Sequence, residues 1–274
     1  MLMLMLMLFP RGNMSKPTVG IFGLTGCAGD QLLILNCEDE LLTIVDLLDI
    51  RSFVMASSAV DEHAQLDIAL VEGAVVTDRD EAMIRRIRER SKLLIAIGAC
   101  AATGGIPGMS PQLDRQRLYD DVYGVDAVFN LTAQRGRALA DVVPVDAVIP
   151  GCPIEKHDLL GAIAALLQGN LPRLKEYPVC TECRERENRC LLIHDGEPCI
   201  GSVTRAGCDA RCPSLGVPCI GCRGPAVDAN YRSLKVLLMS KGHSEADVRD
   251  KLDVFARLPE NALAGGPAEV PCAD

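Results

Sequence analysis

The fold is decided by residues 18–48, which read TVGIFGLTGCAGDQLLILNCEDELLTIVDLL. The first part, residues 18–24, is short and apolar, contains β-branched residues, and ends in a glycine-containing loop. The second part, residues 30–48, has apolar residues at helical spacing. The segment therefore predicts a buried strand, a loop that contains Cys27, and a helix.

The same alternation of strand and helix continues along the chain. A charged amphipathic helix is predicted at residues 79–91, and an apolar helix at residues 159–169, where Gly169 is placed as the C-cap. Strands that alternate with helices indicate a parallel, doubly wound sheet. The further strands are predicted at residues 52–57, 67–73, 93–99 and 146–151.

Composition limits the classes of function. The chain has 274 residues, 49% of them hydrophobic, which is enough for one large domain or two modest ones. Its formal net charge of −9 disfavours non-specific binding to nucleic acid.

Helical periodicity disappears after residue 169 and returns at residues 228–258, where we expect two short helices broken at Gly242.

The N-terminus reads MLMLMLMLFPRGN before a second methionine, Met14. The apolar run of residues 1–9 is too short to span a bilayer, and it lacks the features of an export signal. We expect residues 1–16 to be a disordered extension. We also expect the chain to have no membrane span and the protein to be cytoplasmic. Cysteines are kept reduced in the cytoplasm, so the high cysteine content, 13 residues, points to metal binding and not to disulfides.

Three loops at predicted strand ends each contain one cysteine: Cys27, Cys100 and Cys152. Because the carboxyl ends of parallel strands meet at one edge of a doubly wound sheet, we expect the three thiols to share one metal site. The alternative is that each is a small buried hydrophobic residue. We prefer that alternative for Cys37, which lies in a helical apolar stripe, and assign no role to Cys272.

Eight further cysteines lie between positions 180 and 222. Eight thiolates suit two four-cysteine sites, and their spacing allows either zinc or iron–sulfur clusters. A third site at the strand ends favours clusters, because several spaced metal sites make sense as a path for electrons. The eight residues are Cys180, Cys183, Cys190, Cys199, Cys208, Cys212, Cys219 and Cys222.

These motifs resemble those of nickel–iron hydrogenase small subunits and, more distantly, the cluster-bearing subunit of respiratory complex I. The cysteine-rich segment at residues 178–224 looks like that of the sulfhydrogenase delta subunit and its cytoplasmic relatives. The other matching segments are GLTGCAGD at residues 23–30, VEGAV at 71–75, GACAATGGIPG at 98–108 and PGCPIEK at 150–156.

The resemblance implies three 4Fe-4S clusters, named proximal, medial and distal. Asp30 occupies a proximal position where most relatives have cysteine, and Cys212 stands where relatives with a three-iron medial cluster have proline. The implied ligands are Cys27, Asp30, Cys100 and Cys152 for the proximal cluster, Cys208, Cys212, Cys219 and Cys222 for the medial cluster, and Cys180, Cys183, Cys190 and Cys199 for the distal cluster.

Four charged residues near these motifs have alternative roles. Asp30 is at the predicted start of a helix, where Asp is a favoured N-cap. Glu72 matches the family's Glu-Gly motif and would serve proton movement or cluster hydrogen bonding, or would be a solvated or capping residue. Arg205 and Arg211 would offset cluster charge, pair with a partner, or be solvated at the surface.

The expected architecture is α/β. A flavodoxin-like, doubly wound parallel sheet at residues 17–172 is followed at residues 173–274 by a small irregular, ferredoxin-like iron–sulfur domain with C-terminal helices. The resemblance implies an electron-transfer subunit of a cytoplasmic nickel–iron hydrogenase. It would relay electrons between the nickel–iron site of the large subunit and a flavin-containing partner linked to NAD(P), F420 or iron–sulfur proteins. A complex I-like subunit and a zinc-stapled interaction module are the alternatives.

Overall fold

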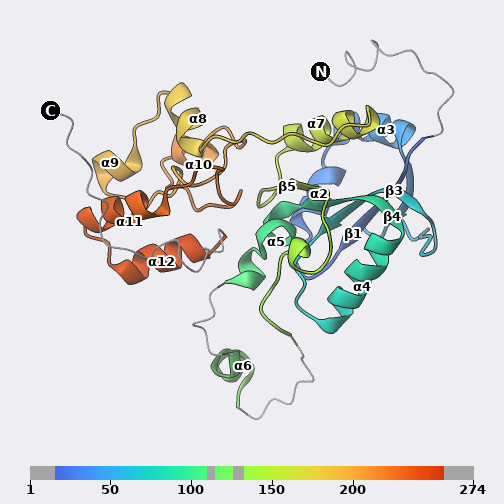
Figure 1. Ribbon diagram of the computed structural model, residues 1–274, viewed down its shortest axis with the longest axis horizontal. Helices are drawn as coiled ribbons and strands as arrows, with labels where there is room; N and C mark the ends of the chain where they lie inside the picture. Colours follow the sequence, from blue (N-terminus) through green and yellow to red (C-terminus); the bar gives the residue numbers. More distant parts are fainter. Residues whose placement is uncertain (1–15, 110–114, 126–132, 256–274) are drawn as a thin grey trace.

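The computed structural model describes residues 16–109, 115–125 and 133–255. Its first part contains a parallel sheet of five strands in the order β2-β1-β3-β4-β5 (Figure 1). This is the strand order of the flavodoxin-like, doubly wound fold, as predicted. The strands are β1 (Thr18–Gly23), β2 (Asp49–Phe53), β3 (Leu66–Glu72), β4 (Ser91–Ile97) and β5 (Ala147–Ile149).

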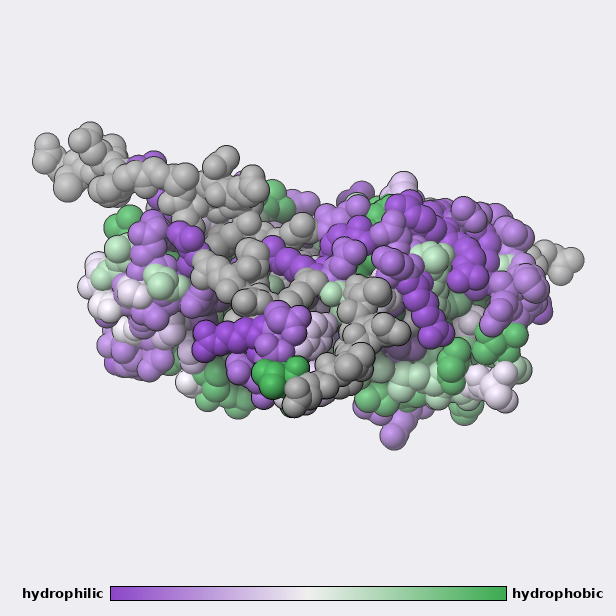
Figure 2. Space-filling view, turned by 90° about the horizontal axis from the view of Figure 1, so that it is seen from below, coloured by the Kyte–Doolittle hydropathy of each residue, from purple (hydrophilic) through white to green (hydrophobic). Residues whose placement is uncertain are grey.

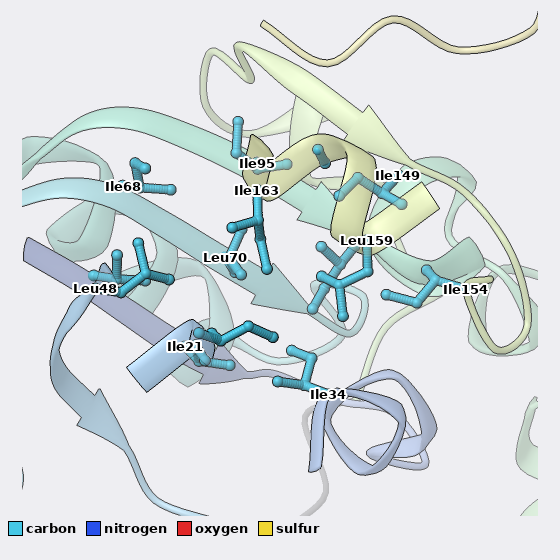
Figure 3. Packing of buried hydrophobic residues seen from close by; sticks show 14 of the residues in the cluster. Ile21, Ile34, Leu48, Ile68, Leu70, Ile95, Ile149, Ile154, Leu159 and Ile163 are labelled. Carbon is cyan, nitrogen blue, oxygen red and sulfur yellow. The ribbon is translucent and has the colours of Figure 1, made fainter. Parts of the chain in front are cut away.

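Helices cover both faces of the sheet. Because successive strand residues point to opposite faces, strands β1, β3, β4 and β5 supply side chains to two cores, one on each face of the sheet. Figure 3 shows one core, in which the strand residues Ile21, Leu70 and Ile95 pack with Leu159 and Ile163. The helices on this face are α2 (Gly29–Leu35), α3 (Glu38–Leu47) and α7 (Lys156–Leu167), and α4 (Asp78–Glu89) packs against the other face.

The prediction of one continuous helix at residues 30–48 is wrong. The structure has two helices, α2 and α3, which are separated by Asn36 and Cys37. The apolar spacing continues across the break, so periodicity alone does not reveal it. Cys37 is fully buried, as predicted, and its Sγ donates a hydrogen bond to the Leu33 carbonyl oxygen at 3.3 Å.

Two other predicted boundaries shift by a few residues. The strand predicted at residues 52–57 is β2, which ends at Phe53. Helix α7 has Gln168 as its C-cap, and the predicted cap Gly169 follows it with a φ of 75°. Such shifts are expected where a boundary depends on cap geometry.

The segment after α7 forms a second part of the molecule beside the sheet (Figure 1). Its last helices, α11 (Tyr231–Ser240) and α12 (Glu245–Asp253), lie on either side of Gly242, as predicted, and share one apolar core. The domain boundary near residue 172 stays a prediction. The remaining helices were not predicted. In the second part they are α8 (Val179–Glu185), α9 (Leu191–Asp195) and α10 (Arg211–Ser214). Before α7 they are α5 (Gly98–Thr103), η1 (Ile106–Gly108), α6 (Arg115–Tyr123) and η2 (Leu139–Asp141).

The described surface is largely hydrophilic on the face that Figure 2 shows, and hydrophobic residues form smaller patches there. None of the helices in the described ranges has the length and hydrophobicity needed to cross a membrane. The expected extension, apart from Lys16, and Cys272 lie outside the described residues.

Candidate metal centres

The first candidate centre lies at the carboxyl ends of β1, β4 and β5. Cys27 is in the loop after β1, Cys100 is in the first turn of α5, and Cys152 follows β5. Burial and then the charges of Cys152, Cys27 and Asp30 raise the pKa of Cys100 to about 11. The sheet topology therefore brings together the three thiols and the carboxyl group expected to form the proximal site.

Asp30 is in the first turn of α2, but it is not the cap of that helix. The N-cap position is Ala28, which makes no side-chain capping hydrogen bond, so the predicted capping alternative is wrong. Instead, Asp30 Oδ1 accepts the backbone N–H of Ile154 at 2.8 Å. The side chain is buried, and this burial raises its pKa to about 7, while the Ile154 N–H opposes the rise and Glu72 adds to it.

Glu72 is the last residue of β3, and its carboxylate accepts hydrogen bonds from the start of helix α2. Its Oε2 accepts the backbone N–H and the side-chain Nε2–H of Gln31, both at 3.1 Å, and its Oε1 accepts the Asp30 N–H at 3.4 Å. The two backbone N–H groups belong to the first turn of a helix, which has no internal acceptors for them. Glu72 is only 2% exposed, so its solvated alternative is wrong and its capping alternative is confirmed.

Gly98 makes room for the Asp30 carboxylate at this centre. Gly98 has a φ of +82°, and a Cβ atom built on it would lie 1.8 Å from Asp30 Oδ2. Any side chain at position 98 would therefore be strained and would also displace the carboxylate. Because Gly98 stands two residues before Cys100 in the chain, this close approach holds the Asp30 carboxylate beside the Cys100 loop.

The second candidate centre lies between α8 and α9. Cys180 and Cys183 are on α8, Cys190 is the N-cap residue of α9, and Cys199 follows that helix. Burial and then the charges of Cys199, Cys183 and Cys190 raise the pKa of Cys180 to about 12. These four thiols, expected to form the distal site, therefore lie close enough to affect each other's ionisation.

The third candidate centre surrounds α10. Burial and then the charges of Cys208, Cys212 and Cys152 raise the pKa of Cys222 to about 11, against an opposing backbone N–H from Cys152. Cys219 is also buried, and its pKa is raised to about 12, chiefly by burial. The thiols expected to form the medial site therefore gather here.

Direct contacts join the three centres in one order. Arg223, which directly follows Cys222 of the medial group, donates from Nη1 to the carbonyl oxygen of Pro150, two residues before Cys152 of the proximal group, at 3.0 Å. The backbone N–H of Cys219, in the medial group, donates to Cys199 Sγ of the distal group at 3.2 Å. The medial group therefore lies between the other two.

The donor chemistry of all three groups fits iron–sulfur clusters. Metals bind cysteine as the thiolate, so a metal that binds here must displace the protons of these thiols. Among the described residues, no three His, Cys, Asp or Glu side chains lie close enough to hold one metal ion together. A four-iron cluster makes a different demand, because each of its thiolates binds a separate iron.

Comparison with known proteins identifies the family. The model of the NADH ubiquinone oxidoreductase 20 Kd subunit matches residues 27–166. Sulfhydrogenase 2 subunit delta from Pyrococcus furiosus is 38% identical over 243 residues, which cover 87% of this chain and 99% of that protein. The chain belongs to the hydrogenase small-subunit family.

A second relative supports this membership, and a solved structure has the same fold. A subunit of the F420-non-reducing hydrogenase from Methanocaldococcus jannaschii is 34% identical over 271 residues, covering 88% of this hydrogenase small subunit and 93% of that protein. The actinobacterial-type NiFe-hydrogenase from Ralstonia eutropha H16 contains a chain that matches at a TM-score of 0.51 and 16% identity, over 93% of this chain and 88% of that one. This hydrogenase small subunit is an electron-transfer subunit.

Sequence reasoning missed two buried charged residues near the centres. Glu182, between Cys180 and Cys183, and Arg223, directly after Cys222, are each 2% exposed. A charge placed inside or beside a cysteine motif is the only sequence signal that marks them. Of the arginines considered instead, Arg211 is largely exposed and pairs with Glu155 at 2.6 Å, and Arg205 is half-buried.

Proposed function

We propose that this hydrogenase subunit carries electrons through three 4Fe-4S clusters held by the three groups of residues described above. Cys27, Asp30, Cys100 and Cys152 would hold the proximal cluster; Cys208, Cys212, Cys219 and Cys222 the medial cluster; and Cys180, Cys183, Cys190 and Cys199 the distal cluster. Such clusters supply reversible one-electron redox chemistry, at potentials that the protein surroundings adjust.

The observation that carries this proposal is the linear order of the groups. Arg223, next to Cys222, donates to the Pro150 carbonyl oxygen in the Cys152 loop, and the Cys219 N–H reaches Cys199 Sγ, so each group contacts the next. Three independent structural metal sites would not need to lie next to one another in this order. An electron path requires it, because every site must lie close to the next.

The residues around the sulfurs also suit this role. Backbone N–H groups that point at sulfur, as from Cys219 to Cys199 Sγ, offset the negative charge of a reduced cluster. Burial of Cys180, Cys219 and Cys222 keeps water away from the sites. The N–H groups make a site accept an electron more readily. Burial reduces the change in solvation that accompanies electron transfer.

Asp30 is our proposed fourth proximal ligand. Burial, and then neighbouring charges that include the Asp30 carboxylate, raise the pKa of Cys100 and Cys152, so the carboxylate lies near both thiols. Oδ1 accepts the Ile154 N–H, and Oδ2 lies against Gly98. Hydrogen bonding of one oxygen would orient the other for iron, and carboxylate is a hard ligand that iron accepts.

The exposed edge of the proximal group suits a partner subunit. We propose that a hydrogenase large subunit with a nickel–iron site covers the proximal edge, where Cys27 and Cys152 are exposed. A flavin-containing subunit linked to NAD(P), F420 or iron–sulfur proteins would accept electrons from the distal site. We place the complex in the cytoplasm, where reduced thiols are available for cluster assembly.

Metal analysis tests this proposal. The chain, purified without oxygen together with its large subunit, should contain about 12 iron atoms and about 12 sulfides in the small subunit. Replacing one thiol in each group, as in Cys100→Ala, Cys222→Ala or Cys190→Ala, should alter the signal of one cluster at a time in electron paramagnetic resonance (EPR). Cys37→Ala, which removes a buried thiol outside the groups, is the control. Stoichiometric zinc in place of iron would overturn the proposal and favour the zinc-stapled module.

A further inference from the structure

The guanidinium of Arg223 joins the two parts of the chain. The side chain is only 1% exposed, and its Nη2 forms an ion pair with Asp158 Oδ2 at 2.6 Å. Its Nη1 donates to the Pro150 carbonyl oxygen at 3.0 Å, and its Nε donates to the Ala206 carbonyl oxygen at 2.9 Å. Asp158 is on α7, and Pro150 follows β5, so one side chain from the second part holds two elements of the sheet domain.

These acceptors lie next to candidate cluster ligands. Pro150 is two residues before Cys152, and Ala206 is two residues before Cys208. Arg223 itself directly follows Cys222. The side chain therefore connects the main chain of one proximal loop to the main chain of two medial loops.

The guanidinium is held closely against this main chain. A Cβ atom built on Gly207 would lie 2.2 Å from Arg223 Nη2 and 2.7 Å from its Cζ, so the group packs directly on the backbone beside Cys208. Guanidinium is planar and presents its donors in a rigid fork, which fixes the directions of all three acceptors together. A buried arginine also needs a paired charge and satisfied donors, and Asp158 and the two carbonyls provide both.

We propose that Arg223 is a positioning residue that sets the distance and orientation between the proximal and medial clusters. This inference rests on the cluster assignment proposed above. Transfer of an electron between two buried sites depends steeply on their separation and relative orientation. The Cys152 loop and the Cys222 loop belong to different parts of the chain, so only tertiary contacts keep the two sites at a constant spacing.

The test uses the complete hydrogenase complex with a substituted small subunit. Two reduced clusters that lie close together split each other's EPR signals, and this splitting reports their separation and orientation. In Arg223→Met all three acceptors lose their donors. We expect the iron content to stay at that of the wild type and the splitting between proximal and medial clusters to be lost or strongly reduced.

A second variant and a control separate positioning from charge. Arg223→Lys keeps the positive charge but lacks the planar set of guanidinium donors. It should therefore also lose much of the splitting while it keeps its iron. Arg205→Met removes a half-buried arginine from the same segment and should leave the splitting unchanged. Wild-type splitting in Arg223→Lys, or equal loss of splitting in Arg205→Met, would overturn the inference. Absence of iron from the wild-type protein would instead overturn the proposed function.

Discussion

Asp30 Oδ1 accepts the backbone N–H of Ile154 at 2.8 Å across 124 residues of sequence. The bond links the first turn of α2 to the loop that contains Cys152, so it connects two of the segments that would form the proposed proximal site. It also occupies one carboxylate oxygen, and the other lies against Gly98. The position of this single side chain therefore depends on three separate loops.

Substitution of Asp30 tests its role as a ligand. Asp30→Cys replaces the carboxylate with a thiolate, and we predict that it keeps a four-iron cluster and shifts the proximal reduction potential. Asp30→Ala removes the donor and should make one iron labile, while Asp30→Asn keeps an oxygen for the Ile154 N–H and controls for the hydrogen bond. Iron analysis and redox-poised EPR measure both effects. An unchanged iron count and potential in Asp30→Ala would show that the carboxylate is not a ligand.

Gly98→Ala is predicted to disrupt the proximal site. The new methyl group would clash with Asp30 Oδ2 and the residue would keep a strained positive φ, which together destabilise the fold by about 3 kcal/mol. Gly169→Ala is a matched control, because Gly169 has a φ of +75° and open space around it. The strain alone should lower its stability by about 1 kcal/mol. Thermal unfolding compares the two, and equal melting temperatures would refute the close approach at Gly98.

Cys212→Pro is predicted to convert the medial cluster from four irons to three. Cys212 is the second residue of α10, a position at which proline leaves the helical hydrogen bonds intact. Cys208, Cys219 and Cys222 would remain as ligands. EPR of the oxidised protein should show a new three-iron signal, and Cys212→Ser, which retains a weaker donor, serves as the comparison. An unaltered spectrum would place Cys212 outside the cluster.

Glu182→Gln tests the buried carboxylate of the distal motif. Glu182 Oε1 accepts the Gly207 N–H at 2.9 Å and Oε2 accepts the Ala210 N–H at 3.2 Å. An amide has only one acceptor oxygen, so one buried N–H loses its partner, which destabilises the protein by about 2 kcal/mol. The ion pair with Lys175, 2.6 Å between Nζ and Oε1, is lost as well. Glu185→Gln, at an exposed position of the same helix, should leave the melting temperature unchanged. Similar melting temperatures for both variants would contradict this role.

Local pattern explains most of the predicted elements. The apolar runs around Ile21, Leu70 and Ile95 predicted strands that the structure contains, because burial on both faces of a parallel sheet demands continuous hydrophobic runs. The break at Cys37 was not predictable in this way. Both sides of it are helical and apolar, and the break lets α2 and α3 pack separately against the same face of the sheet.

The order and spacing of residues are enough to show which cysteines follow predicted strands, how the other cysteines divide into sets, and which family they resemble. The contacts of Asp30, Glu72 and Arg223 are visible only in the folded protein. Their hydrogen-bond partners lie in other elements, far away in the sequence. Gln31 and Glu72 are 41 residues apart, Arg223 and Pro150 are 73 apart, and Asp30 and Ile154 are 124 apart. Hydrogen bonds of this kind leave no periodic pattern in sequence, because they depend on where folded segments meet and not on the spacing of residues along the chain.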